Sequence, residues 1–90
     1  MKVRRHYTFN GYVQGVGFRW RARFAADAHN CTGWVENKWD GSVEMEIQGE
    51  EADIDEVIEE IRDGSYIEIR DMETSDMPLE KFERRFRVRG

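Results

Sequence analysis

Residues 11–20, GYVQGVGFRW, place three glycines and one arginine between a strand pattern and a helix pattern. Before this segment apolar and polar residues alternate, which is typical of a half-buried strand. The apolar positions of that strand are Val3, Tyr7, Phe9 and Val13. After the segment, apolar residues recur at spacings of three and four, which predicts an amphipathic helix over residues 19–28. Its predicted buried face consists of Trp20, Phe24, Ala25 and Ala28, and Asn30 is suited to end it because asparagine tolerates the left-handed conformation.

The remaining elements follow from periodicity and turn residues. Residues 32–49, TGWVENKWDGSVEMEIQG, predict a β-hairpin, because the Asp-Gly pair at 40–41 favours a tight turn. Apolar residues at helical spacing then predict a second helix that ends at Gly64, with Ile54, Val57, Ile58 and Ile61 on its buried face. The last predicted elements are a strand around Ile67 and Ile69, a loop over residues 71–80, and a strand with Phe82, Phe86 and Val88.

The predicted order is βαββαβ plus a C-terminal strand. It favours an α+β fold, a ferredoxin-like split βαβ sandwich with two helices on one face of an antiparallel sheet. Ninety residues suffice for one modest core, so we expect residues 1–90 to form a single domain. The chain has no membrane-length apolar run, no signal-peptide pattern and one cysteine, Cys31. We therefore expect a soluble cytoplasmic protein in which Cys31 forms no internal disulfide and is either packed in the core or semi-buried.

The formal net charge of −5 is unevenly distributed along the chain. Residues 1–30 carry six Lys and Arg against one acid, whereas residues 31–90 carry eight against eighteen. An acidic chain is a poor nucleic-acid binder, but a local cationic region around residues 11–20 is able to attract a small anion. A solvated charged surface is the alternative interpretation.

The glycines at 15 and 17 allow the turn to point successive N–H groups into one concavity at the start of a helix, which is typical of an anion site. Arg19 offers a planar fork of donors that matches two phosphate oxygens. The alternative is a tight connection followed by a surface arginine. The segment contains neither GxxxxGK[ST] nor GxGxxG, which excludes the usual nucleotide-binding loops.

Four segments in order, GYVQGVGFR, GWVEN, DGSVE and QG, resemble the pattern of the acylphosphatase family. The resemblance implies a ferredoxin-like fold and hydrolysis of acyl phosphates to a carboxylate and inorganic phosphate, without a metal or cofactor. It implies that Arg19 binds phosphate and that Asn37 positions the attacking water. The backbone N–H groups assigned to the phosphoryl group are those of Gln14, Gly15, Val16, Gly17 and Phe18. No carboxylate, histidine or thiol belongs to the matched site, so a phosphate oxygen of the substrate is expected to take the proton from water.

Other side chains have less specific interpretations. His6 and His29 are general-base candidates, but a place on the polar face of a strand and a place near a helix end explain them better. Trp20 and Phe24 are predicted to pack in the core. Trp39, beside the hairpin turn, is predicted to be partly exposed and is a candidate for the acyl side of a pocket.

Two further function classes are open at this point. Ferredoxin-like sandwiches also serve as RNA-binding modules, but the strand over residues 43–48 offers acids and no aromatic side chains to an open sheet face, which disfavours RNA. A non-catalytic phosphate-binding domain, like the acylphosphatase-like region of hydrogenase-maturation carbamoyltransferases, is the closer alternative. The expected partners are a small-molecule acyl phosphate and inorganic phosphate, with no nucleic acid and no membrane, and the chain is expected to be a monomer.

Overall fold

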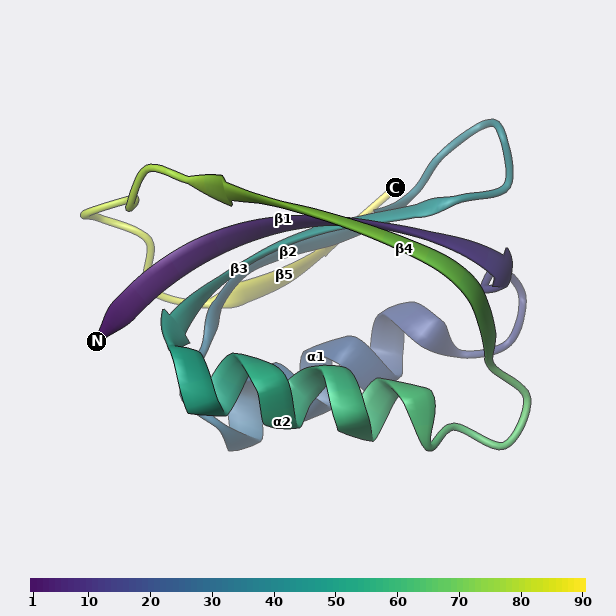
Figure 1. Ribbon diagram of the computed structural model, residues 1–90, viewed down its shortest axis with the longest axis horizontal. Helices are drawn as coiled ribbons and strands as arrows, with labels where there is room; N and C mark the ends of the chain where they lie inside the picture. The colour runs from purple at the N-terminus through teal and green to yellow at the C-terminus, as the bar shows by residue number, and fades with distance from the viewer.

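Five strands and two helices make up the computed structural model, which describes residues Met1 to Gly90. In order they are β1 (Lys2–Tyr12), α1 (Phe18–Ala28), β2 (Thr32–Asn37), β3 (Val43–Glu50), α2 (Glu51–Arg62), β4 (Glu68–Met77) and β5 (Phe86–Arg89). Both helices cover one face of the sheet and leave the other face open (Figure 1). The predicted ferredoxin-like α+β sandwich is confirmed. Neither helix has the combination of length and apolar character that crossing a membrane requires.

The sheet has the strand order β4-β1-β3-β2-β5 and is mixed, so the expectation of a wholly antiparallel sheet is wrong. β5 runs parallel to β2, while the other pairs are antiparallel. The reason lies in the connection from β4 to β5. It crosses β1 and β3, where Glu80 bonds to the Gln48 side chain and Glu83 to Arg4. Because β2 starts at the end of the sheet where β4 finishes, a strand that enters there beside β2 must run parallel to it.

The last two strands differ from their predicted bounds. β4 extends to Met77 and takes in most of the segment predicted as a loop, pairing with β1 along its length. It is an edge strand whose residues 73–77 are all exposed, so it lacks the apolar alternation that marks a half-buried strand. β5 begins only at Phe86, and Phe82 lies before it with an 88 % exposed side chain.

Helix α1 buries a largely different face from the predicted one, with only Ala25 common to both. Trp20 and Phe24, which were expected in the core, are 53 % and 71 % exposed. The buried residues are Phe18, Ala22, Ala25 and Ala26. The end of the helix is as predicted: Asn30 has a φ of 56°, and the following N–H, of Cys31, donates to Ala26 O at 2.9 Å.

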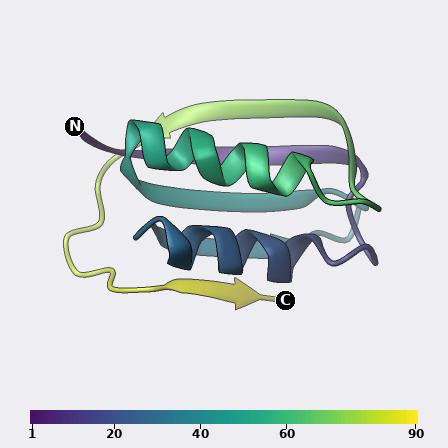
Figure 2. The ribbon, with the colours of Figure 1, turned by 90° about the horizontal axis from the view of Figure 1, so that it is seen from below.

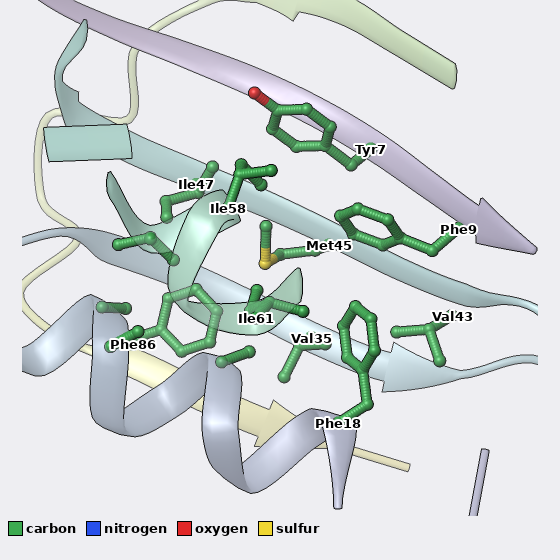
Figure 3. Close-up of a cluster of buried hydrophobic side chains, with 14 of the residues drawn as sticks. Tyr7, Phe9, Phe18, Val35, Val43, Met45, Ile47, Ile58, Ile61 and Phe86 are labelled. Atoms are coloured by element: carbon green, nitrogen blue, oxygen red, sulfur yellow. The ribbon is translucent and has the colours of Figure 1, made fainter. Parts of the chain in front are cut away.

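The core between sheet and helices fixes both ends of the loop that connects β1 with α1 (Figure 3). Phe9, near the end of β1, contacts Phe18 at the start of α1 with ring centroids 4.9 Å apart. Tyr7 stacks on Phe9 at 5.6 Å. The predicted face of α2 is also buried, and it consists of Ile54, Val57, Ile58 and Ile61.

Candidate functional site

The loop between β1 and α1 is anchored on both sides by buried side chains. Val13 before it and Phe18 after it are 1 % and 2 % exposed. Gly15 and Gly17 have φ angles of 71° and 82°, in the left-handed region that favours glycine. A side chain at either glycine would meet no atom within 4 Å, so the space above the loop is open. Residues 14–18 therefore form an open concavity with fixed ends, here called the cradle.

Backbone N–H groups from Gln14 to Trp20 donate to no acceptor within the protein. The first hydrogen bond of α1 runs from Arg21 N to Gly17 O at 3.0 Å. No side chain caps the helix, and its first turn holds no acidic residue. Free N–H groups and the partial positive charge of a helix N-terminus together favour an anion. The structure thus places the N–H groups predicted to bind phosphate, those of Gln14 to Phe18, in one loop where no protein group competes for them.

Arg19 lies in the first turn of α1, on the side of the helix that faces the C-terminus. Its Nη1 donates a hydrogen bond to the carbonyl oxygen of Gly90 at 2.8 Å. The side chain is half-buried, and no Asp or Glu side chain forms an ion pair with it. The guanidinium therefore brings a positive charge that no acidic side chain neutralises to the edge of the cradle.

Asn37 is the last residue of β2 and pairs with Val43 of β3. Its side-chain Oδ1 is buried and has no hydrogen-bond partner, whereas buried polar atoms nearly always have one. Gly90 lies next to Asn37, since a side chain on Gly90 would come within 3.8 Å of the Asn37 backbone oxygen. Gly90 is therefore adjacent to both Arg19 and Asn37, and the two predicted residues lie at the same end of the molecule. Figure 2 shows the C-terminus beside the start of α1.

The side chain of Gln14 connects the cradle with the β2–β3 hairpin. Its Nε2 donates to Lys38 O at 2.7 Å and to Ser42 O at 2.8 Å. The sequence pointed only to the backbone N–H of Gln14, because no local pattern distinguishes a glutamine that bridges two loops from a solvated one. Since Asn37 directly precedes Lys38, these two bonds set the position of the cradle relative to Asn37.

The hairpin turn over residues 38–42 is stabilised by its own polar contacts. Lys38 N donates to Ser42 O at 2.9 Å. Asp40 Oδ1 accepts hydrogen bonds from the hydroxyl and the backbone N–H of Ser42 at 2.6 and 3.0 Å, and these bonds lower the pKa of Asp40. The carboxylates of Glu44 and Glu36 raise the pKa of the neighbouring Lys38 ammonium. The hairpin side of the site is therefore held by charged groups that keep their ordinary charge at neutral pH.

The other titratable candidates lie away from the cradle. His29 follows α1 at the end opposite Arg19, near two carboxylates of α2. His6 lies in β1 and packs edge-on against Trp34, with ring centroids 6.0 Å apart. Cys31 is buried as predicted, and burial raises the pKa of its thiol to about 11. No group of three His, Cys, Asp or Glu side chains is arranged to hold a metal ion.

Two of the larger surface hollows are relevant to ligand binding. The larger, about 730 Å³, lies on the open face of the sheet, includes neither Arg19 nor Asn37, and is lined mainly by arginines. Trp34 is among its lining residues, with the Arg89 guanidinium 4.2 Å from its ring centroid. β3 offers no aromatic side chain to the open face, as expected, whereas β2 contributes Trp34 to it. The second hollow, about 620 Å³, borders the cradle at Val16 and Gly17.

Comparison with known sequences gives one consistent family. The acylphosphatase family model matches residues 5–88. An acylphosphatase of Leuconostoc mesenteroides is 41 % identical over 83 residues, which cover 89 % of this chain and 90 % of the relative. An acylphosphatase of Oceanobacillus iheyensis is 41 % identical over 87 residues, which cover 88 % of this chain and 96 % of the relative.

Solved structures give the same result. The crystal structure of acylphosphatase from Bacillus subtilis matches with a TM-score of 0.89 at 28 % identity, and the match covers both chains completely. Full-length HypF, crystallised in its phosphate- and nucleotide-bound form, matches with a TM-score of 0.89 at 30 % identity, and there the match covers 12 % of the HypF chain. The fold thus occurs both as a protein of this size and as one part of a larger protein.

Proposed function

The chain belongs to the acylphosphatase family, and from this premise we propose that the cradle, Arg19 and Asn37 form its active site. The enzyme hydrolyses acyl phosphates to a carboxylate and inorganic phosphate. The observation that carries the assignment of residues is the row of unpaired N–H groups in the cradle next to Arg19. An acyl phosphate is already activated, so the enzyme has to stabilise phosphoryl charge and orient water rather than form a covalent intermediate.

In this proposal the cradle and Arg19 bind the phosphoryl group. The N–H groups of residues 14–18 point their dipoles at the phosphoryl oxygens, and Arg19 supplies a full charge with a forked donor geometry. The charge on these oxygens is redistributed as the bond to the leaving group breaks. Donors that are fixed before the reaction stabilise that state without reorganisation, because the cradle is anchored at Val13 and Phe18.

Asn37 is proposed to orient the attacking water. Its Oδ1 accepts a hydrogen bond from the water, and the buried, unpartnered state of this atom supports that role. An amide holds water over a wide pH range because it does not titrate. The oxygen–phosphorus bond forms while the phosphorus–oxygen bond to the acyl group breaks, and the carboxylate leaves with the electron pair.

The proton of the water is proposed to pass to a phosphoryl oxygen of the substrate. Glu36, next to Asn37 in sequence, forms ion pairs with Arg89 at 2.9 Å and with Lys38 at 3.4 Å. Both carboxylate oxygens of Glu36 are thus engaged by cations, so we do not assign Glu36 as the base. The attacking water keeps one proton in the new P–OH group and passes the other to a phosphoryl oxygen, so a dianionic acyl phosphate gives a carboxylate and dihydrogen phosphate.

We also propose that residues 1–90 act as one domain and as a monomer in the cytoplasm, without a nucleic acid partner. One core of 17 buried residues supports a single domain, and all proposed site residues come from one chain. A free buried thiol is compatible with a reducing compartment, and the net charge of −5 disfavours nucleic acid. Light scattering at assay concentration tests the monomer, and a dimer mass contradicts it.

The test of the active site follows hydrolysis of acetyl phosphate by the purified protein and its variants. Arg19→Ala is expected to lower kcat/KM by about 100- to 1000-fold, the range for loss of one preorganised charge donor. Inorganic phosphate should inhibit the parent competitively, and Arg19→Lys should weaken that inhibition because lysine lacks the fork. Asn37→Ala should lower kcat by a similar factor of about 100 to 1000 while phosphate inhibition changes little.

Arg84→Ala is the matched control, since Arg84 is an exposed arginine of the open face. It should leave kcat/KM and phosphate inhibition at the parent values. Equal phosphate inhibition in the parent and in Arg19→Ala would remove Arg19 from the site. Phosphate binding without turnover in the folded parent would instead favour a non-catalytic binding module.

A further inference from the structure

An apolar hollow of about 620 Å³ begins at the cradle and runs between α1 and the α2–β4 connection. Val16 and Gly17 of the cradle form one wall, and Trp20 and Phe24 of α1 form the next. Tyr66 of the connection completes it, and its side chain is 81 % exposed. Three exposed aromatic rings thus surround one depression beside the cradle.

The hollow and the proposed water site lie on opposite sides of α1. Arg19 reaches toward Gly90, which lies next to Asn37. Arg21 reaches the other way, and its Nε donates to Glu60 O of α2 at 2.5 Å. Figure 2 shows this arrangement, with the C-terminus on one side of α1 and α2 on the other, and with the α2–β4 connection at the same end as the cradle.

Phosphoryl transfer determines which side the acyl group occupies. The attacking and leaving oxygens lie roughly in line across the phosphorus. If Asn37 holds the water on one side of the cradle, the leaving carboxylate and its acyl group lie on the other side. That direction leads past Val16 and Gly17 to the hollow.

We propose that this hollow binds the acyl group of the substrate and selects apolar acyl groups about the size of an aromatic ring. The proposal rests on the proposed active site. Trp20 and Phe24 supply the apolar contact surface, and Tyr66 closes the far side. Gly64 permits the floor to pack closely, because a side chain there would come within 2.7 Å of Ile67 Cδ1 and 3.0 Å of Arg21 Cδ.

The geometry favours Trp20 over the other exposed tryptophan, Trp39, as a contact for the acyl group. Trp39 is 95 % exposed, which confirms its predicted exposure. However, it lies on the hairpin that carries Asn37, on the side from which the water attacks. A leaving acyl group points away from that hairpin, so Trp39 serves as the matched control for Trp20.

The experiment compares benzoyl phosphate with acetyl phosphate in the parent, Trp20→Ala, Phe24→Ala and Trp39→Ala. The readout is the ratio of kcat/KM for benzoyl phosphate to that for acetyl phosphate. One lost aromatic contact should lower this ratio about three- to tenfold in Trp20→Ala and in Phe24→Ala. In Trp39→Ala the ratio should stay at the parent value. Since the changed side chains are exposed, thermal unfolding should show that all three variants fold.

An unchanged ratio in both Trp20→Ala and Phe24→Ala overturns the proposal, and so does a lowered ratio in Trp39→Ala alone. Failure of the active-site proposal looks different, because Arg19→Ala and Asn37→Ala would then retain turnover of both substrates. Inhibition by phenylphosphonate, compared with inhibition by inorganic phosphate, gives a readout with an aromatic ligand that is not hydrolysed. Trp20→Ala should weaken the inhibition by phenylphosphonate about three- to tenfold and that by phosphate much less.

Discussion

Replacing Gln14 with alanine tests whether the cradle depends on the β2–β3 hairpin for its position. The change removes two hydrogen bonds, from Nε2 to Lys38 O at 2.7 Å and to Ser42 O at 2.8 Å. Both carbonyls keep a backbone donor, from Gly41 N at 3.2 Å and from Lys38 N at 2.9 Å. No buried acceptor is therefore left without a partner, and the cost is that of two ordinary hydrogen bonds. We expect the free energy of unfolding to fall by about 1 to 2 kcal/mol.

The effect on catalysis should exceed the effect on substrate binding. The N–H groups of the cradle remain, but their position relative to Asn37 is no longer fixed by a direct contact. Displacement of reacting groups by an ångström costs roughly 100-fold in rate, so we expect kcat to fall about 10- to 100-fold. Phosphate inhibition should weaken less, because Arg19 and the N–H groups are unchanged.

Gln14→Glu has the same shape and makes the test sharper. A carboxylate there faces two carbonyl oxygens, so at pH 7 this variant should be less stable than Gln14→Ala. The repulsion raises the pKa of the introduced carboxyl in the folded state. The stability of Gln14→Glu relative to the parent should therefore recover below about pH 4.3, the pKa of the carboxyl in the unfolded chain. It should decline as the pH rises through the higher pKa of the folded state.

Urea unfolding at pH 4 and pH 7 and initial rates with acetyl phosphate measure these quantities. Two results would refute the reasoning. One is a Gln14→Ala variant with parent stability and parent kcat. The other is a Gln14→Glu variant that is more stable than Gln14→Ala at pH 7.

Three further predictions concern the open face and the thiol. Arg4 is 3 % exposed and forms ion pairs with Glu46 and Glu83, each at 2.7 Å. Arg4→Ala should therefore lower the free energy of unfolding, measured in urea titrations, by about 3 kcal/mol. A loss below about 1 kcal/mol would contradict this prediction. Burial raises the pKa of Cys31 from 9.0 to about 11, so at pH 8 its reaction with a disulfide reagent should be about 100-fold slower than in the unfolded chain. Stability should also fall as pH rises from 9 toward 11, because the unfolded thiol loses its proton first; equal reaction rates or a flat stability profile would contradict the burial.

Where periodicity is strong, the sequence predicts the fold well. The face of α2 with Ile54 and Ile61 and the end of α1 at Asn30 both match, because each is determined by neighbours within a few residues. The direction of β5 has no such local signal, since it depends on where the β4–β5 connection crosses the sheet. For a similar reason, the sequence does not predict how far β4 extends. An exposed edge strand obtains its structure from pairing with β1, not from a pattern of its own.

The candidate site likewise contains residues that the sequence predicts and contacts that it does not predict. The glycines of the cradle are readable because their φ angles require glycine, and Arg19 follows them within two residues. The resemblance to a known family added Asn37. The contacts of Gln14 with the hairpin and of Arg19 with Gly90 span 24 or more residues, and sequence spacing does not predict them.

The orientation of α1 explains both the wrong prediction and the proposed acyl site. Two apolar stripes run along this helix, one with Trp20 and Phe24 and one with Phe18 and three alanines, and periodicity does not rank them. Residues advance by about 100° each along a helix, so burying Trp20 instead would rotate α1 by roughly half a turn. Arg19 would then point away from Gly90 and Asn37. The exposure of Trp20 beside the cradle and the direction of Arg19 toward Gly90 therefore follow from one orientation of α1, in which small alanines face the sheet and large aromatic side chains lie at the proposed acyl site.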